Sequence, residues 1–244
     1  MSRASDLWKS PKRADNSQGR TIMIELNFQQ IWKYQNLLVD GALLTLALTL
    51  IATLAGLVIG VAGAALLRNG PGPVRWVIRG YVEVIRNTPM LIQLFLIFFV
   101  LPSFGLKLPP TESAAVSLSL YFGAYATEIV RAGLDSIPRN QIEAGECLGL
   151  TRLQVLRYIV LGPAFRNIYP ALTAQVVLML LATSLASQVS AEELFHAGGL
   201  IDSRTYRSFE VYIVICAIYF VMFIAIKIVF AVIERFAFPW PVRR

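Results

Sequence analysis

The sequence predicts an all-α membrane protein with about five membrane-spanning helices, and three observations lead to this fold class. First, 56% of the 244 residues are hydrophobic and only 15% are charged. Mean hydropathy is +0.61, which is high for a soluble domain of this length. Second, the chain contains five long apolar runs, each close to the roughly 20 residues that a helix needs to cross a bilayer. Third, one polar stretch, residues 139–164, separates the third run from the fourth.

The first 36 residues are expected to form an N-terminal tail and an interfacial helix. Residues 1–22 are polar throughout, so we expect them to be disordered and to contain no cleavable signal peptide. Met23 offers a second possible start of the chain. A short helix on the membrane surface is then predicted by residues that recur at helical spacing, namely Phe28, Ile31, Trp32, Gln35 and Leu38.

A transmembrane domain is expected over residues 37–236. Its spans are predicted from the apolar runs at 41–67, 87–106, 113–131, 167–191 and 211–233. The first run contains Gly56, Gly60 and Gly63, which would let a neighbouring helix approach closely. Residues 237–244 are expected to form a tail.

The distribution of basic residues predicts the orientation in the membrane. Twelve lie on one side, in the links after spans one and three and at the C-terminus: Arg68, Arg75, Arg79, Arg86, Arg131, Arg139, Arg152, Arg157, Arg166, Arg235, Arg243 and Arg244. Four lie on the other side, among several acidic residues: Lys33, Lys107, Arg204 and Arg207. Since the basic side faces the cytoplasm, the N-terminus is expected outside and the C-terminus inside.

The polar stretch 139–164 is predicted to contain two short helices hinged at Gly149. Pro138 would end the preceding segment, and Thr151 could cap the second helix. Glycine permits the tight turn between them. The predicted orientation places this stretch in the cytoplasm, where it would serve as a docking surface for a soluble partner. An ordinary surface loop is the alternative interpretation.

The motifs in this stretch resemble a known family. Glu143-Ala144-Gly145, then Gly149, and then Leu161, Pro163 and Ala164 resemble the "EAA" loop of permease subunits in bacterial ABC importers. Residues 81–89, 124–133 and 183–187 resemble the branch that takes up polar amino acids, and the resemblance covers roughly residues 37–236. It departs at Gly145, where alanine is usual, at Pro163, which comes one position late, and before Thr183, where many members carry a lysine.

The resemblance implies a permease subunit of an ATP-driven importer of polar amino acids in the bacterial cytoplasmic (inner) membrane. Its partners would be ABC ATPase subunits, a second identical or similar permease, an external substrate-binding protein and membrane lipids. The chain would not be an enzyme and would hold no cofactor, because ATP and Mg²⁺ would bind to the ATPase. Consistently, the sequence has no G-x-x-x-x-G-K-[ST] loop. An ion-coupled secondary transporter is the alternative, but the predicted spans lack acidic residues at mid-depth.

Three sets of candidate site residues follow from this interpretation. The ATPase-docking set is Arg139, Glu143, Ala144, Gly145, Gly149 and Arg152. For Glu143 an ion pair within the loop is the alternative. The translocation pathway set consists of polar residues at membrane depth, Gln93, Thr183, Ser184, Ser187 and Gln188. The alternative for these residues is hydrogen bonding between helices.

The third set is structural or gating. It comprises Arg86, Asn87, Thr88 and Pro89 at the start of span two, and Glu128 and Arg131 in span three. Asn87 or Thr88 is expected to cap the helix that begins at Pro89, as an elbow or as part of a gate. Glu128 and Arg131 are three residues apart, which favours an ion pair on one helix face.

Other functional classes are not supported by the sequence. No basic face on a soluble domain indicates a nucleic-acid partner. The single histidine, His196, has no cysteine or second histidine nearby, so we expect a surface residue and no metal site. Cys147 and Cys216 lie in unlike surroundings and predict neither a disulfide nor a redox motif.

Overall fold

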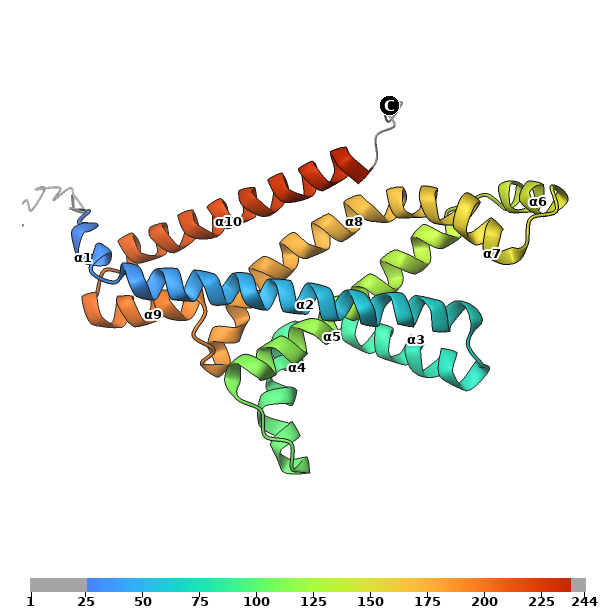
Figure 1. Ribbon diagram of the computed structural model, residues 1–244. Helices are drawn as coiled ribbons and strands as arrows, with labels where there is room; N and C mark the ends of the chain where they lie inside the picture. Colours follow the sequence, from blue (N-terminus) through green and yellow to red (C-terminus); the bar gives the residue numbers. More distant parts are fainter. Residues whose placement is uncertain (1–25, 238–244) are drawn as a thin grey trace, which may run out of the picture.

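The computed structural model describes residues 26–237, which fold into helices joined by short turns (Figure 1). Most of the long helices lie roughly along one direction, whereas α4 projects away from them. The α-helices are α1 (Gln29–Trp32), α2 (Gln35–Asn69), α3 (Gly72–Arg86), α4 (Met90–Phe95), α5 (Pro110–Asp135), α6 (Arg139–Cys147), α7 (Arg152–Gln154), α8 (Leu161–Ala182), α9 (Leu194–Thr205) and α10 (Ser208–Ala237). Two segments are π-helical, η1 (Leu96–Val100) and η3 (Val155–Val160). Two are 3₁₀-helical, η2 (Leu101–Phe104) and η4 (Thr183–Val189).

The described part of the chain has three helices that are long and apolar enough to cross a membrane. They are α2, the continuous run Arg152–Val189 that includes α8, and α10. A fourth candidate is α3 together with Met90–Phe104, if this pair, bent by 112°, is counted as one span. Polar and charged residues keep α5 out of this group, but α5 is 26 residues long and packs along α2 (Figure 1). If both the bent pair and α5 are counted, the bundle has the five segments expected from the sequence.

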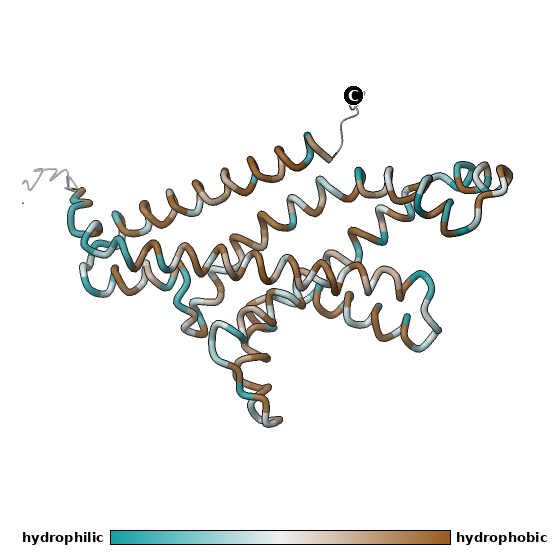
Figure 2. Tube along the Cα trace, in the orientation of Figure 1, coloured by the Kyte–Doolittle hydropathy of each residue, from teal (hydrophilic) through white to brown (hydrophobic). Residues whose placement is uncertain are grey.

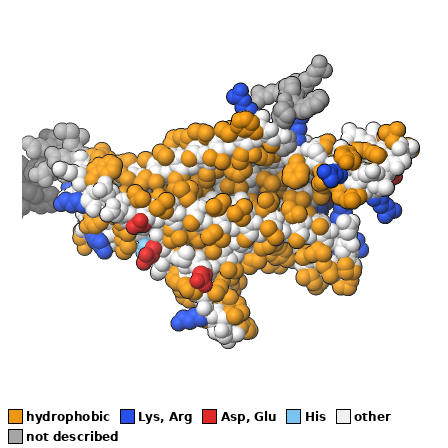
Figure 3. Space-filling view, in the orientation of Figure 1, with side chains coloured by type: hydrophobic (Ala, Val, Ile, Leu, Met, Phe, Trp, Pro, Cys, Tyr) orange, Lys and Arg blue, Asp and Glu red, His pale blue; other side chains and the backbone are white. Residues whose placement is uncertain are grey.

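Hydrophobic residues make up most of the helices in the middle of the molecule (Figure 2). In the space-filling view, hydrophobic side chains cover this region, and most charged side chains lie toward the ends (Figure 3). Leu43, Leu50, Leu54 and Val58 of α2, for example, are all more than half exposed. An apolar surface of this extent is stable only in contact with lipid or with another protein. The surface therefore supports the predicted membrane location.

The closest packing in the fold is between α2 and α5. Gly56, Gly60 and Gly63 of α2 are all buried. A Cβ atom on Gly60 would lie only 2.4 Å from the Cβ of Ala126, and one on Gly63 would lie 2.6 Å from Oγ1 of Thr127. The predicted role of these glycines in close helix packing is therefore confirmed.

The link between the first two predicted spans is not a loop but the helix α3. It lies beside the C-terminal part of α2, and Tyr81 ties it to α5, because the Tyr81 hydroxyl donates to the carbonyl oxygen of Leu120 (2.6 Å). The exposed face of α3 is partly apolar, with Trp76 and Val77 at 78% and 60% exposure. Because arginines recur along this segment, it was interpreted from the sequence as a charged link between two spans.

The predicted caps at the start of span two are wrong. Asn87 and Thr88 instead cap the end of α3, since the Asn87 side-chain amide donates to the carbonyl oxygen of Glu83 (2.8 Å) and the Thr88 hydroxyl donates to that of Val84 (2.8 Å). Pro89 is extended and directly precedes α4. Because the helices on either side are bent by 112°, these residues form an elbow, and a role in gating stays a prediction.

The segment between the fourth and fifth predicted spans, residues 192–210, is not a simple loop. It contains α9, which packs against α2 and α10 and buries Leu194, Ala197, Gly198 and Ile201. Several charged residues near this helix suggested solvent exposure. The apolar residues at helical spacing between them are the signal that the charges obscured.

Glu193 holds the start of α9 in place and is completely buried. Its carboxylate accepts hydrogen bonds from the backbone N–H groups of Phe195 and His196, both at 2.8 Å, and from the hydroxyl of Tyr219 on α10 at 2.9 Å. From α2, Thr45 Oγ1 lies 3.5 Å from Oε2 of Glu193 and accepts from the backbone N–H of Leu194 (3.1 Å). One acidic side chain therefore joins three helices.

The interfacial helix is shorter than predicted. α1 buries Ile31 and exposes Trp32, but the helix is interrupted before Gln35, where α2 begins. Met23, the rest of residues 1–25 and most of the expected C-terminal tail lie outside the described residues.

We expect Gly60→Ala to destabilise the protein by about 1–3 kcal/mol, because the added methyl group overlaps Ala126 and the backbone of α5. Thermal unfolding of the purified full-length chain in detergent measures this effect. Gly80→Ala is the matched control, since a Cβ there meets nothing within 4 Å and alanine favours the helix. Equal melting temperatures for the two variants would contradict the close packing of α2 on α5.

We expect Glu193→Ala to lower the free energy of unfolding by about 2 kcal/mol or more, because it leaves two partly buried N–H groups and the Tyr219 hydroxyl without their acceptor. Limited proteolysis around α9 and thermal unfolding test the prediction. The neighbouring Glu192 is exposed, so Glu192→Ala should behave like the unmodified protein. A mild effect of both substitutions would show that α9 is held by apolar packing alone.

Candidate functional site

The polar stretch forms an exposed element at one end of the helix bundle. α6 extends beyond the C-terminal end of α5 and lies at the same end as the C-terminal ends of α2 and α10 (Figure 1). Arg139, Glu143, Ala144 and Arg152 are all exposed. Glu143 has no ion-pair partner within residues 26–237, so the alternative of an ion pair inside the loop is not observed.

A Schellman motif ends α6 at the predicted hinge. The backbone N–H of Leu150 donates to the carbonyl oxygen of Gly145 (3.2 Å), and that of Gly149 donates to Glu146 (2.9 Å). Gly149 has a φ of +78°, in the left-handed region that residues with a side chain rarely adopt. The predicted turn at Gly149 is confirmed.

The second helix begins as predicted, but it does not end within the polar stretch. Thr151 and Gln154 form a capping box, in which the Thr151 backbone N–H donates to Oε1 of Gln154 (2.8 Å) and the Gln154 N–H donates to the Thr151 hydroxyl (3.4 Å). From α7 the chain continues through η3 into α8, as one helical run to Val189. The expectation of two separate short helices is therefore wrong for the second one. Pro163 lies near the start of α8, directly after the π-helical η3, and does not end the run.

Gly145 faces inward and not toward a partner. It is buried, and a Cβ there would lie 2.3 Å from the Cδ1 atom of Ile159 in η3. Gly145 therefore contributes to the site by letting α6 pack on η3. The sequence did not single out Leu148 and Leu153, which are 81% and 74% exposed beside the turn. Exposed leucines around a rigid turn are suited to a protein partner.

Four of the five candidate pathway residues lie in η4, and the three that carry a hydroxyl group use it in local hydrogen bonds. The hydroxyls of Thr183, Ser184 and Ser187 donate to carbonyl oxygens three residues earlier, at 2.7–2.8 Å. Thr183 is completely buried, whereas Gln188 is exposed. These three bonds stay within the helical run Arg152–Val189, whereas Thr183 also has a side-chain hydrogen bond with Tyr219 of α10.

Gln93, the fifth candidate, serves the elbow. Its side-chain nitrogen donates to the carbonyl oxygens of Ile85 (2.8 Å) and Thr88 (3.1 Å), and so fastens α4 to the end of α3. Its Oε1 atom is buried and has no partner among the described residues. Because α4 contacts η4, the five candidates gather in two neighbouring groups.

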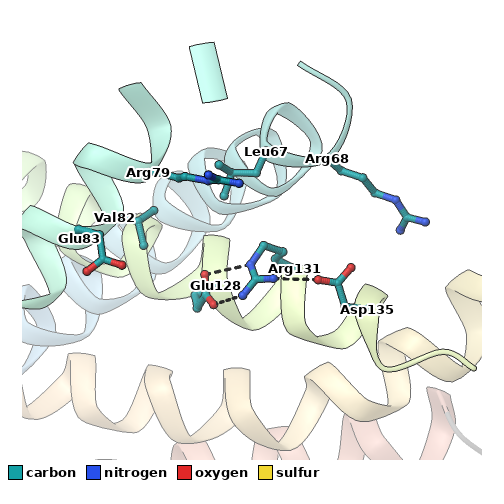
Figure 4. A pocket seen from close by; sticks show the side chains of 8 residues that line it. All are labelled: Leu67, Arg68, Arg79, Val82, Glu83, Glu128, Arg131 and Asp135. Atoms are coloured by element: carbon teal, nitrogen blue, oxygen red, sulfur yellow. Dashed lines mark hydrogen bonds and ion pairs between the residues drawn. The ribbon is translucent and has the colours of Figure 1, made fainter. Parts of the chain in front are cut away.

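The predicted ion pair between Glu128 and Arg131 forms on α5, and Arg131 also reaches Asp135 at 2.8 Å. These three side chains line a pocket of about 450 Å³ between α2, α3 and α5 (Figure 4). Arg79 and Glu83 of α3 line its other side. The remaining residue of this set, Arg86, lies with its guanidinium 5.4 Å from the ring centre of Tyr125, which is a cation–π contact.

His196 lies in the first turn of α9 and is partly exposed, which agrees with the expected surface position. Both cysteines are free and exposed. Residues 26–237 contain no cluster of histidine, cysteine, aspartate and glutamate that could hold a metal ion.

Comparison with known proteins identifies the family of this fold. Residues 52–238 match the family described as "Binding-protein-dependent transport system inner membrane component". The chain is 36% identical over 218 residues to the L-cystine transport system permease protein TcyB of Bacillus subtilis, covering 89% of this chain and 92% of that protein. It is 31% identical over 214 residues to the glutamine transport system permease protein GlnP of Escherichia coli K12, covering 87% and 98%.

Two solved structures share the fold. A crystal structure of an amino acid ABC transporter with histidines superposes with a TM-score of 0.81 at 36% identity, over 86% of this chain and 98% of that one. An inward-facing structure of the MetNI methionine ABC transporter gives a TM-score of 0.68 at 22% identity, over 87% and 99%, and supports the fold alone. The chain therefore belongs to the family of binding-protein-dependent transport system inner membrane components, the permease subunits of ABC transporters.

Proposed function

We propose that this chain is the permease subunit of an ATP-driven importer for polar amino acids. The observation that carries the proposal is its 36% identity, over nearly the whole fold, both to an L-cystine permease and to a solved amino acid ABC transporter. Members of this family are transport components and not enzymes. The ion-coupled alternative finds no support among these relatives. The buried Glu193 does not restore it, because its carboxylate is used to hold α9.

Family membership implies ATPase and binding-protein partners in general. We propose that ATPase subunits dock on α6 and on the turn at Gly149, with Glu143, Arg139 and Arg152 forming charged contacts around Leu148 and Leu153. ATP and Mg²⁺ would bind in those subunits. A second permease, identical or similar, would complete the pathway, and an external binding protein would deliver the substrate at the opposite end.

The exposed position of α6 supports an orientation with the N-terminus outside and the C-terminus in the cytoplasm. α2 and α10 both run toward the end that carries α6 (Figure 1). The excess of basic residues flanks the same helix ends. ATP is cytoplasmic, so a docking surface for an ATPase has to face that side.

For the pathway we propose that Gln93 and the η4 residues contact substrate weakly. The support is the buried Oε1 of Gln93, which lacks a partner among the described residues and could accept a hydrogen bond from an ammonium group. Because the η4 hydroxyls already donate to backbone oxygens, they retain only their acceptor capacity. Such contacts would guide a polar substrate without holding it tightly.

The proposed function is tested by copurification and transport. The tagged chain should copurify with an ABC ATPase, and vesicles that contain the complex and its external binding protein should take up a polar amino acid only when ATP is hydrolysed. A binding measurement of the external protein against a panel of amino acids identifies the substrate. Uptake driven by an ion gradient without ATP would contradict the proposal.

Gly149→Leu should leave membrane insertion intact but abolish ATP-driven uptake. A leucine at φ +78° costs about 1–2 kcal/mol and distorts the turn that presents α6. The matched control is Gly162→Leu, because Gly162 is exposed in α8, has no positive φ and would meet nothing with its Cβ. Membrane content by immunoblot and uptake in vesicles are the two measurements. Normal uptake by the Gly149 variant would count against docking at this turn.

A further inference from the structure

An elongated apolar groove of about 750 Å³ lies between α2, α5 and α8, with α6 and η3 closing one end. Leu57 and Val61 of α2 form one wall, and Phe165 and Leu172 of α8 form the other. Val130 of α5 contributes to its floor. Since these walls belong to membrane-spanning segments, the groove lies at the depth of the bilayer.

Polar side chains occur only at the end of the groove near α6. Arg68 and Asn69 end α2, and Arg152 begins α7, whereas Glu146 is the one acidic residue among the lining side chains. Both arginines are exposed, and neither forms a salt bridge within residues 26–237. Figure 4 shows the Arg68 guanidinium directed away from the ion pairs of Glu128, Arg131 and Asp135. The rim is therefore net positive.

We propose that this groove binds an anionic phospholipid of the leaflet on the α6 side, with an acyl chain along the apolar walls and the phosphate at Arg68 and Arg152. The ligand has to be apolar along most of its length and negatively charged at one end, which describes an amphiphile. Guanidinium groups pair well with phosphate oxygens, and basic pockets between spanning helices are suited to anionic headgroups. A free phosphate would satisfy the rim but leave the walls unused.

A helix from a second copy of the chain is the competing occupant. It would fill the apolar walls, but the two arginines at the rim would require acidic partners at one defined position. The bilayer offers anionic groups at that depth without any further requirement. The bound lipid would also touch Ile142 and Glu146 of α6 and Val155 of η3. The element proposed to dock the ATPase therefore borders the lipid site.

Photo-crosslinking distinguishes the possible occupants. The full-length chain, with p-benzoylphenylalanine in place of Ala65, is reconstituted in vesicles of equal phosphatidylglycerol and phosphatidylethanolamine, irradiated and analysed by intact mass. Ala65 is exposed and lines the groove, whereas Ala62 is exposed on the same helix outside the lining residues. We expect lipid adducts at position 65 to be about fivefold enriched in phosphatidylglycerol relative to those at position 62.

Substitutions at the rim complete the test. Arg68→Gln should reduce this enrichment about fivefold, and Arg75→Gln on α3, which does not line the groove, should leave it unchanged. Millimolar inorganic phosphate at constant ionic strength should not affect it. A crosslinked dimer, equal lipid composition at positions 65 and 62, absence of any adduct at 65, or loss of enrichment with inorganic phosphate would each overturn the phospholipid assignment.

Discussion

The close approach of α2 and α5 is the contact on which the other elements depend. In a membrane there is little hydrophobic force between helices, so association relies on close van der Waals packing between small residues. Gly60 and Gly63 provide this contact, because the missing side chains let Ala126 and Thr127 of α5 lie directly against the backbone of α2. α5 then supports its neighbours, because α3 is tied to it by Tyr81 and α6 follows directly from its C-terminal end.

The sequence predicted those parts of the fold that depend on composition and on single residues with strict backbone preferences. Long apolar runs predicted where the spanning helices lie. The combination of Pro138, Gly149 and Thr151 located α6, its final turn and the next cap. Left-handed φ angles and capping are local properties, so one residue is enough to indicate them. The exposed position of the proposed docking element followed from its polarity.

The sequence could not predict parts that depend on which face a helix presents to its neighbours. α3 contains charged residues at regular spacing, α9 has charged residues near both of its ends, and both segments were interpreted as connections. Glu193 shows why: a glutamate in a polar run looks solvated, and only the arrangement of α2, α9 and α10 brings Tyr219 and two backbone N–H groups to its carboxylate. Gly145 likewise turned out to be a packing residue, because η3 lies against its side of α6.

The connections of α6 explain how a docked ATPase could act on the bundle. α6 is joined to α5 by three residues and to α7 by the Schellman turn, and Gly145 seats it on η3. η3 continues without interruption into α8 and on to η4, so one helical run extends from the docking element to the candidate pathway. π-helical segments are commonly found at functional sites. A displacement of α6 would therefore be transmitted along α8 by a continuous helix, whereas the opposite end of the bundle is held by the hydrogen bonds of Glu193.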